Sequence, residues 1–122
     1  MKRIIGKNTT GELKKGYKNQ DFAGRWKAMS FVEQMANIGS EVERALNWKA
    51  KHNDDFSRKA FERALELIDL TLDVSTSFTR LKEVARVREV FADFFNGNQF
   101  QSTDVSWKKY FFSFTYAARI NR

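Results

Sequence analysis

The chain has 122 residues, a net charge of +7, no cysteine, no proline and one histidine. A chain of this length forms a single domain. The lack of cysteine excludes disulfides, thiolate metal sites, iron–sulfur clusters and cysteine nucleophiles, and one histidine excludes multi-histidine metal sites. The positive charge favours anionic partners such as nucleic acid or an acidic protein.

Residues 1–22 are interpreted as a basic N-terminal arm. They hold three of the six glycines and carry six basic and two acidic residues, a net charge of +4. Their few apolar residues lack helical spacing, and basic arms of this kind contact phosphates. The arm therefore supplies three candidate nucleic-acid-binding residues, Lys14, Lys15 and Lys18. A solvated tail that only aids solubility is the alternative.

Residues 23–122 are predicted to form an all-α fold, an antiparallel four-helix bundle joined by short loops. The predicted helices cover residues 25–51, 56–73, 78–95 and about 104–120. In the first of them, Phe31, Met35, Ile38, Val42 and Ala45 are spaced by three and four positions, which is one helical stripe.

Gly39 lies among small residues inside the first predicted helix. A glycine there costs about 1 kcal/mol relative to alanine, so a packing reason is expected. We predict that Gly39 marks the point where a second helix crosses.

The later helices are bounded by polar residues that suit caps. Asp54 or Asp55 is predicted to cap the second helix, and Thr76 or Ser77 the third. For the fourth, Ser102, Thr103 and Asp104 are the candidates. Gly97 fits the left-handed position that follows the third helix.

The sequence contains little that supports a catalytic function. His52 lies in the loop after the first helix, and no Ser–His–Asp motif accompanies it. Glu62, Glu66, Asp69 and Asp73 share one face of the second helix. No Glu-x-x-His motif completes a di-metal site, so we interpret this face as solvated or paired with arginines of a neighbouring helix. We expect no enzyme activity, no metal and no cofactor.

The third predicted helix carries Lys82, Arg86 and Arg88. They are candidates for phosphate contacts. An ordinary charged surface with pairing along the helix is the alternative.

The last helix holds six aromatic residues within 107–116. At 100° per residue they point around most of the helix, so either the helix is central or part of its surface meets another subunit. We predict a homo-oligomer with Trp107, Tyr110, Phe111 and Phe114 in the interface. Stacking of unpaired bases on the aromatic rings is a second use. The basic residues that would flank those bases are Lys108, Lys109, Arg119 and Arg122.

Three runs resemble a family of small prokaryotic helical proteins without an assigned activity: SFVEQMANIGSEVERA at 30–45, AFERALELIDLT at 60–71 and YFFSFTYAAR at 110–119. The layout is more distantly similar to the four-helix bundles encoded by ribosomal-RNA intervening sequences. It is also similar to the accessory variability determinant of diversity-generating retroelements, whose last helix has an aromatic-then-basic ending like that at 117–122. The resemblance implies a basic protein that forms rings of subunits. For the retroelement protein, it also implies association with a reverse transcriptase and nucleic acid.

No apolar run approaches the roughly 18 residues of a membrane span, and the apolar start of the chain ends at Gly6. We therefore expect a cytoplasmic protein without a membrane partner. The sequence favours an oligomeric, non-enzymatic bundle that binds RNA or a ribonucleoprotein through phosphate contacts. The alternative is a protein-interaction module, such as the partner subunit of a nucleotidyltransferase or of a toxin–antitoxin pair.

Overall fold

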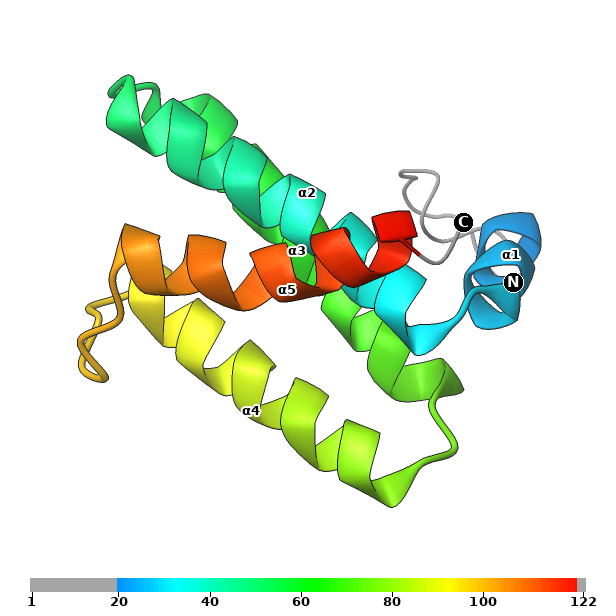
Figure 1. The fold of residues 1–122 in the computed structure, drawn as a ribbon. Helices are drawn as coiled ribbons and strands as arrows, with labels where there is room; N and C mark the ends of the chain where they lie inside the picture. The colour runs from blue at the N-terminus through cyan, green and yellow to red at the C-terminus, as the bar shows by residue number, and fades with distance from the viewer. Residues whose placement is uncertain (1–19, 121–122) are drawn as a thin grey trace, which may run out of the picture.

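A computed structural model describes residues 20–120 of the chain, and residues 1–19, 121 and 122 lie outside the described part. The described residues form five helices and no strand, which confirms the all-α class (Figure 1). The helices are α1 (Gln20–Ala28), α2 (Phe31–Ala50), α3 (Asp54–Val74), α4 (Phe78–Phe95) and α5 (Asp104–Ile120). None of them is both long enough and apolar enough to cross a membrane.

The prediction of one helix over 25–51 is wrong, because the chain breaks between Ala28 and Phe31. Ser30 has extended backbone, and its hydroxyl accepts a hydrogen bond from the Glu33 N–H at 3.1 Å. The Glu33 carboxylate accepts in return from the Ser30 N–H at 3.0 Å. This reciprocal capping box begins a new helix. The described part therefore has five helices where four were predicted.

The boundary of the predicted N-terminal arm also changes. Asp21 and Phe22 belong to α1, so the arm as predicted for 1–22 ends inside a helix. Its remaining residues, 1–19, lie outside the described part. The Phe22 ring stacks on Trp26, with centroids 5.9 Å apart.

Side-chain caps set the other helix boundaries. Asn53, not one of the two aspartates that follow it, caps α3, and its side chain accepts from the Phe56 N–H at 3.0 Å. Ser77 caps α4, as one of the two candidates predicted. Thr103 caps α5 by accepting from the Ser106 N–H at 3.0 Å. Gly97 has a φ of +120°, which confirms its left-handed conformation after α4.

The antiparallel pair of α2 and α3 forms the centre of the fold. A tight turn at 51–53 joins α2 to α3, so these two helices run in opposite directions and pack along each other (Figure 1). Helix α5 crosses α2, and α4 packs on α3. The expected core stripe of α2 is confirmed from Met35 to Ala45, whereas Phe31 is only partly buried. Facing it are buried residues of the other helices, which include Phe61, Ile68, Val84, Phe91, Trp107 and Phe111.

A buried hydrogen bond fastens α1 to α3. The Trp26 indole N–H donates to the Thr71 hydroxyl at 2.9 Å, and both side chains are buried. The Gln34 side-chain amide donates to the Trp26 carbonyl at 2.8 Å. Because buried polar groups without partners are costly, these bonds allow a tryptophan and a glutamine to lie inside the fold.

Thr71→Val should destabilise the protein by about 1–3 kcal/mol, since it leaves the buried Trp26 N–H without an acceptor. In the double variant with Trp26→Phe that N–H is gone. The losses of unfolding free energy in the two single variants should therefore add up to about 1 kcal/mol more than the loss in the double variant. Urea unfolding of the four proteins measures the difference. Strict additivity would contradict a stabilising role for the bond.

Gly39 marks the crossing of α2 and α5, as predicted. A Cβ atom placed on Gly39 would lie 2.8 Å from the Phe111 Cβ, closer than real Cβ contacts. The Phe111 Cβ is attached directly to the α5 backbone, so it cannot move away without shifting the helix. A side chain at position 39 is therefore incompatible with the observed spacing of α2 and α5.

Gly39→Ala should cost about 1–3 kcal/mol of stability through overpacking, partly offset by a gain of about 1 kcal/mol in helix propensity. Gly24→Ala is the matched control, because Gly24 is exposed in α1 and a Cβ atom added there would have nothing within 4 Å. The control should be neutral or stabilising by up to about 1 kcal/mol. Thermal unfolding of both variants tests this, and equal midpoints would show that α5 is free to shift.

Candidate functional site

Helix α5 has two distinct faces. Trp107 and Phe111 point inward and are 6% and 3% exposed, while Phe112 and Tyr116 are 62% and 54% exposed. At 100° per residue the exposed rings share one outer face with every basic residue of α5. We define this outer face by seven residues: Val105, Lys108, Lys109, Phe112, Tyr116, Arg119 and Ile120.

The inward aromatic residues form part of the chain's own core. The Trp107 ring lies 5.3 Å from that of Phe91 and 6.1 Å from that of Phe111. Phe114 meets Phe31 edge to face at 6.0 Å. Their burial is explained within one chain, so the aromatic residues that α5 leaves well exposed are Phe112 and Tyr116. The homo-oligomer and its interface stay predictions, and within the single chain Trp107 and Phe111 are buried and Phe114 is partly buried.

Tyr110, the fourth residue of the predicted interface, is half-buried and pairs with α4. Its hydroxyl donates to the Glu83 carboxylate at 2.6 Å. Burial raises the pKa of Tyr110 far above its usual value, and the hydrogen bond to Glu83 raises it further. The phenol therefore stays protonated and ties α5 to α4.

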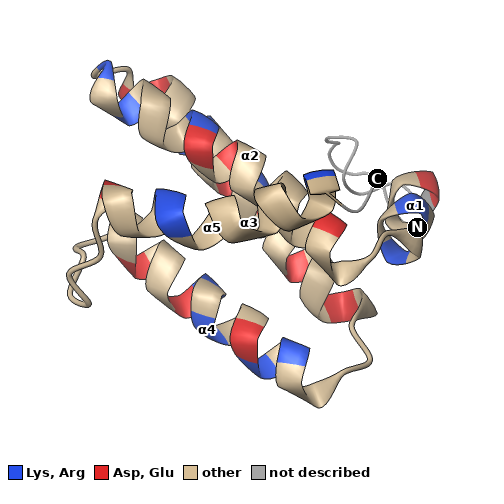
Figure 2. Cartoon of the chain, in the orientation of Figure 1, with Lys and Arg blue, Asp and Glu red and all other residues tan. Residues whose placement is uncertain are grey.

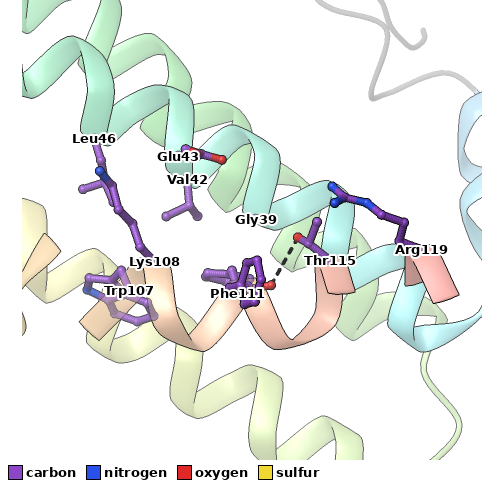
Figure 3. Close-up of a pocket in the computed structure, with 10 residues that line it drawn as sticks. Gly39, Val42, Glu43, Leu46, Trp107, Lys108, Phe111, Thr115 and Arg119 are labelled. Atoms are coloured by element: carbon purple, nitrogen blue, oxygen red, sulfur yellow. Dashed lines mark hydrogen bonds between the residues drawn. The ribbon is translucent and has the colours of Figure 1, made fainter. Parts of the chain in front are cut away.

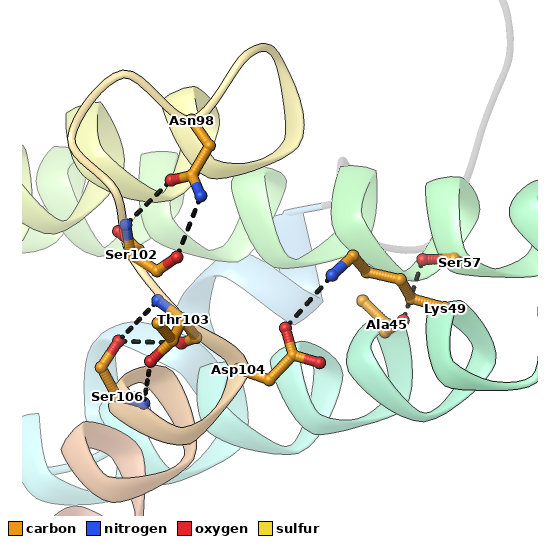
Figure 4. A network of polar contacts seen from close by, with 8 residues as sticks. All are labelled: Ala45, Lys49, Ser57, Asn98, Ser102, Thr103, Asp104 and Ser106. Atoms are coloured by element: carbon orange, nitrogen blue, oxygen red, sulfur yellow. Dashed lines mark hydrogen bonds and ion pairs between the residues drawn. The ribbon is translucent and has the colours of Figure 1, made fainter.

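The outer face of α5 is apolar and positively charged at once. The Phe112 and Tyr116 rings lie 6.2 Å apart with an interplanar angle of 28°. Among the described residues, Lys108, Lys109 and Arg119 form no ion pair. The only acidic residue of α5 is Asp104 at its start, and the Lys49 ammonium pairs with it at 3.2 Å (Figure 4). The three cations of the face therefore remain available to an anionic ligand.

A groove of about 300 Å³ separates this face from α2. Its floor is apolar and includes Gly39, Val42 and Phe111. Lys108 and Arg119 project from α5 at the two ends of the groove, and Glu43 of α2 lies between them (Figure 3). The groove thus continues the outer face toward α2 and adds one carboxylate to it.

The cations of α4 are engaged within the chain. Arg88 donates two hydrogen bonds to the Asp69 carboxylate of α3, at 2.5 and 3.3 Å. This hydrogen bonding raises the pKa of Arg88. Arg86 pairs with Glu89 at 3.1 Å and lies over the Phe100 ring. Lys82 lies over the Phe78 ring. Basic and acidic residues are interspersed along α4 in Figure 2, and two of its four cations, Arg86 and Arg88, form ion pairs.

The acidic face of α3 was expected to be solvated or paired with arginines of a neighbouring helix. The ion pair between Asp69 and Arg88 of α4 confirms such pairing for one of its four carboxylates. His52 is exposed in the turn after α2, where its φ is +61°. Within residues 20–120, no three His, Cys, Asp or Glu side chains are grouped so that they could hold a metal ion.

The positive charge of the protein is unevenly distributed. Residues 20–120 carry 15 basic and 14 acidic residues, a net charge of only +1. Residues 1–19 carry six basic residues and one acidic residue, a net charge of +5. Four of the predicted nucleic-acid-binding residues, Lys14, Lys15, Lys18 and Arg122, lie outside the described residues. The helical body is therefore almost neutral, and its α5 face is a local exception.

Comparison with protein-family models, curated proteins and solved structures gave no match to this chain. The resemblance to small prokaryotic helical bundles stays a prediction. The site is accordingly described from its own geometry.

Sequence reasoning counted the aromatic residues of α5 but did not separate its two faces. The signal was present in the spacing. Positions 107, 111, 114 and 118 form one stripe, and positions 105, 109, 112, 116 and 120 form the opposite one. The basic residues of α5, which are Lys108, Lys109 and Arg119, all lie in or beside the second stripe, and this indicates that the second stripe faces solvent.

The bond between Tyr110 and Glu83 should make stability depend on alkaline pH. A raised pKa in the fold contributes stability below the unfolded pKa of tyrosine, about 10, and that stability is lost as pH rises above it. The free energy of unfolding of the unmodified protein should therefore fall more steeply above pH of about 10 than that of Tyr110→Phe. Urea unfolding across this range measures the slopes. Tyr116→Phe, on the exposed face, is the control and should follow the unmodified protein.

Proposed function

We propose that the protein is a non-enzymatic, cytoplasmic binding module for RNA or a ribonucleoprotein, held through phosphate contacts. The observation that carries this proposal is the segregation of charge. A nearly neutral helical body follows a concentrated positive charge at residues 1–19, and one face of α5 bears three cations without an ion-pair partner among residues 20–120. Lysines and arginines that neutralise phosphates release counterions, and this release drives sequence-independent binding.

Ion pairs within the chain favour some of the candidate residues over others as phosphate contacts in this proposal. Arg88 already shares its two hydrogen bonds with Asp69, and Arg86 is paired with Glu89. Moving either to a phosphate would give up an existing ion pair, so these two arginines gain less from phosphate contact than an unpaired cation does. The candidates without an ion pair among residues 20–120, or outside those residues, are Lys14, Lys15, Lys18, Lys82, Lys108, Lys109, Arg119 and Arg122.

In this proposal α2, α3, α4 and α5 act together as an antiparallel four-helix bundle, and α1 is an added segment fastened to α3. The buried contact of Gly39 with Phe111 and the bond from Tyr110 to Glu83 hold α5 in a fixed orientation. A rigid element presents its side chains with less loss of entropy on binding than a mobile loop does.

A second candidate function is a protein-interaction module, such as the partner subunit of a nucleotidyltransferase or of a toxin–antitoxin pair. The specific observation in its favour is that Val105, Phe112, Tyr116 and Ile120 are all more than half exposed on one helix face. Exposed apolar groups arranged in a row mark interaction surfaces. Charge reversal at Lys108 and Lys109 would leave such an interaction nearly unchanged but would weaken RNA binding.

Binding to a random RNA should weaken steeply as the salt concentration rises. In a plot of log affinity against log salt concentration, each phosphate contact should add about 0.7 to the steepness of the slope. Replacing Lys14, Lys15 and Lys18 by glutamine should reduce that slope by up to about 2. The matched control replaces Arg58, Lys59 and Arg63 of α3 by glutamine, which changes the net charge equally. Fluorescence anisotropy over a salt series measures both slopes.

The control should retain the slope of the unmodified protein. If the slope falls equally in the two triple variants, net charge alone attracts RNA and no defined segment contacts it. If the unmodified protein binds no RNA even at low salt, phosphate binding is not its function and the protein-interaction module takes its place.

A further inference from the structure

We propose that the outer face of α5 stacks unpaired bases, so that the RNA bound by this protein is single-stranded. This inference rests on the proposed function, because it names the class of RNA that the same protein would bind. Its new element is a pair of exposed aromatic rings placed among cations on one helix face.

The two rings are suited to bases by their exposure and orientation. Phe112 and Tyr116 are one helical turn apart, nearly parallel, and more than half exposed. Flat aromatic rings that are exposed to solvent bind other flat rings by stacking. Every base offers such a surface, and stacking on aromatic side chains is therefore tolerant of sequence.

The cations extend along the same face on both sides of the rings. Lys108 and Lys109 precede Phe112 by about one turn, and Arg119 follows Tyr116 by about one turn. Lys108 and Arg119 are eleven positions apart, which is about 16 Å along a helix that rises 1.5 Å per residue. At about 3.4 Å per stacked nucleotide this distance corresponds to about five nucleotides. The face can therefore contact phosphates on both sides of two stacked bases.

Charge and geometry favour single-stranded RNA over the other occupants of such a face. A second copy of the chain would bring like charges together, because in a symmetric contact the same three cations come from each copy. An RNA duplex keeps its bases stacked and presents mainly phosphates and 2′-hydroxyls. Of these three occupants, only unpaired nucleotides supply both the anions and the open ring surfaces that the face would bind.

The test compares one labelled RNA of about twelve nucleotides, roughly twice the estimated site, with the same strand annealed to its complement. Fluorescence anisotropy at low salt gives the affinity for each form. The unmodified protein should bind the single strand more tightly. The double substitution Phe112→Ala with Tyr116→Ala should weaken single-strand binding about tenfold or more and leave duplex binding unchanged.

Two further double variants keep the result interpretable. Phe112→Leu with Tyr116→Leu keeps apolar side chains but removes the rings, so it should behave like the alanine variant. Phe78→Ala with Phe100→Ala removes two other exposed aromatic residues, of α4 and of the loop after it, and should have no effect. Because all four residues are exposed, thermal unfolding should confirm that each variant folds.

Four results would overturn the inference. Equal affinity for single strand and duplex, unchanged in the alanine variant, would leave phosphate binding in place but show that the rings do not stack bases. Wild-type affinity in the leucine variant would show that apolar area alone is needed, as for a protein or lipid partner. Loss of binding to phosphatidylserine vesicles in the alanine variant, with RNA binding intact, would assign the face to a membrane surface. The absence of RNA binding in every protein would reject the proposed function as well.

Discussion

The close contact between Gly39 and Phe111 determines how α5 sits on the rest of the molecule. Without a side chain at position 39, the two helix backbones approach closely enough for Phe111 and Trp107 to enter the core. Once these two residues are buried, the helical period leaves Phe112 and Tyr116 no direction except outward. The candidate site is therefore a consequence of core packing, and the exposure of its rings follows from a glycine on another helix.

Pairing within the chain separates the cations that hold the fold together from those that face solvent. Arg88 links α4 to α3 through Asp69, and Lys49 links α2 to the start of α5 through Asp104. The Lys49 ammonium also lies over the Phe94 ring. Because these basic residues have partners on other helices, the distribution of available positive charge differs from the distribution of lysine and arginine in the sequence. Availability, not composition, separates α5 from α4 as a surface for anions.

Much of the fold was predictable from local patterns, and the errors have identifiable causes. The stripe of α2, the crossing at Gly39 and the conformation of Gly97 depend on spacing and on single residues, which the sequence displays directly. The break at Ser30 was missed although Ser30 and Glu33 have the spacing of a capping box, because the apolar spacing around Met29 runs through it. The partners of Arg88 and Tyr110 could not be predicted, since they depend on how far one helix is displaced along its neighbour, and periodicity within a helix carries no information on that displacement.

The bond between Trp26 and Thr71 has a consequence for the first nineteen residues of the chain. It fixes α1 on α3, so the place of Gln20, where the described residues begin, is set by a buried bond of the core. The six basic residues that precede Gln20 are joined covalently to that point, so the anchoring of α1 decides where on the helical body their charge is attached. Under the proposed function, a strand that contacts both residues 1–19 and the outer face of α5 would meet the second site at an effective concentration set by the covalent connection between them. Two weak contacts on one strand would combine into a stronger one, and their combined strength would depend on where α1 is anchored.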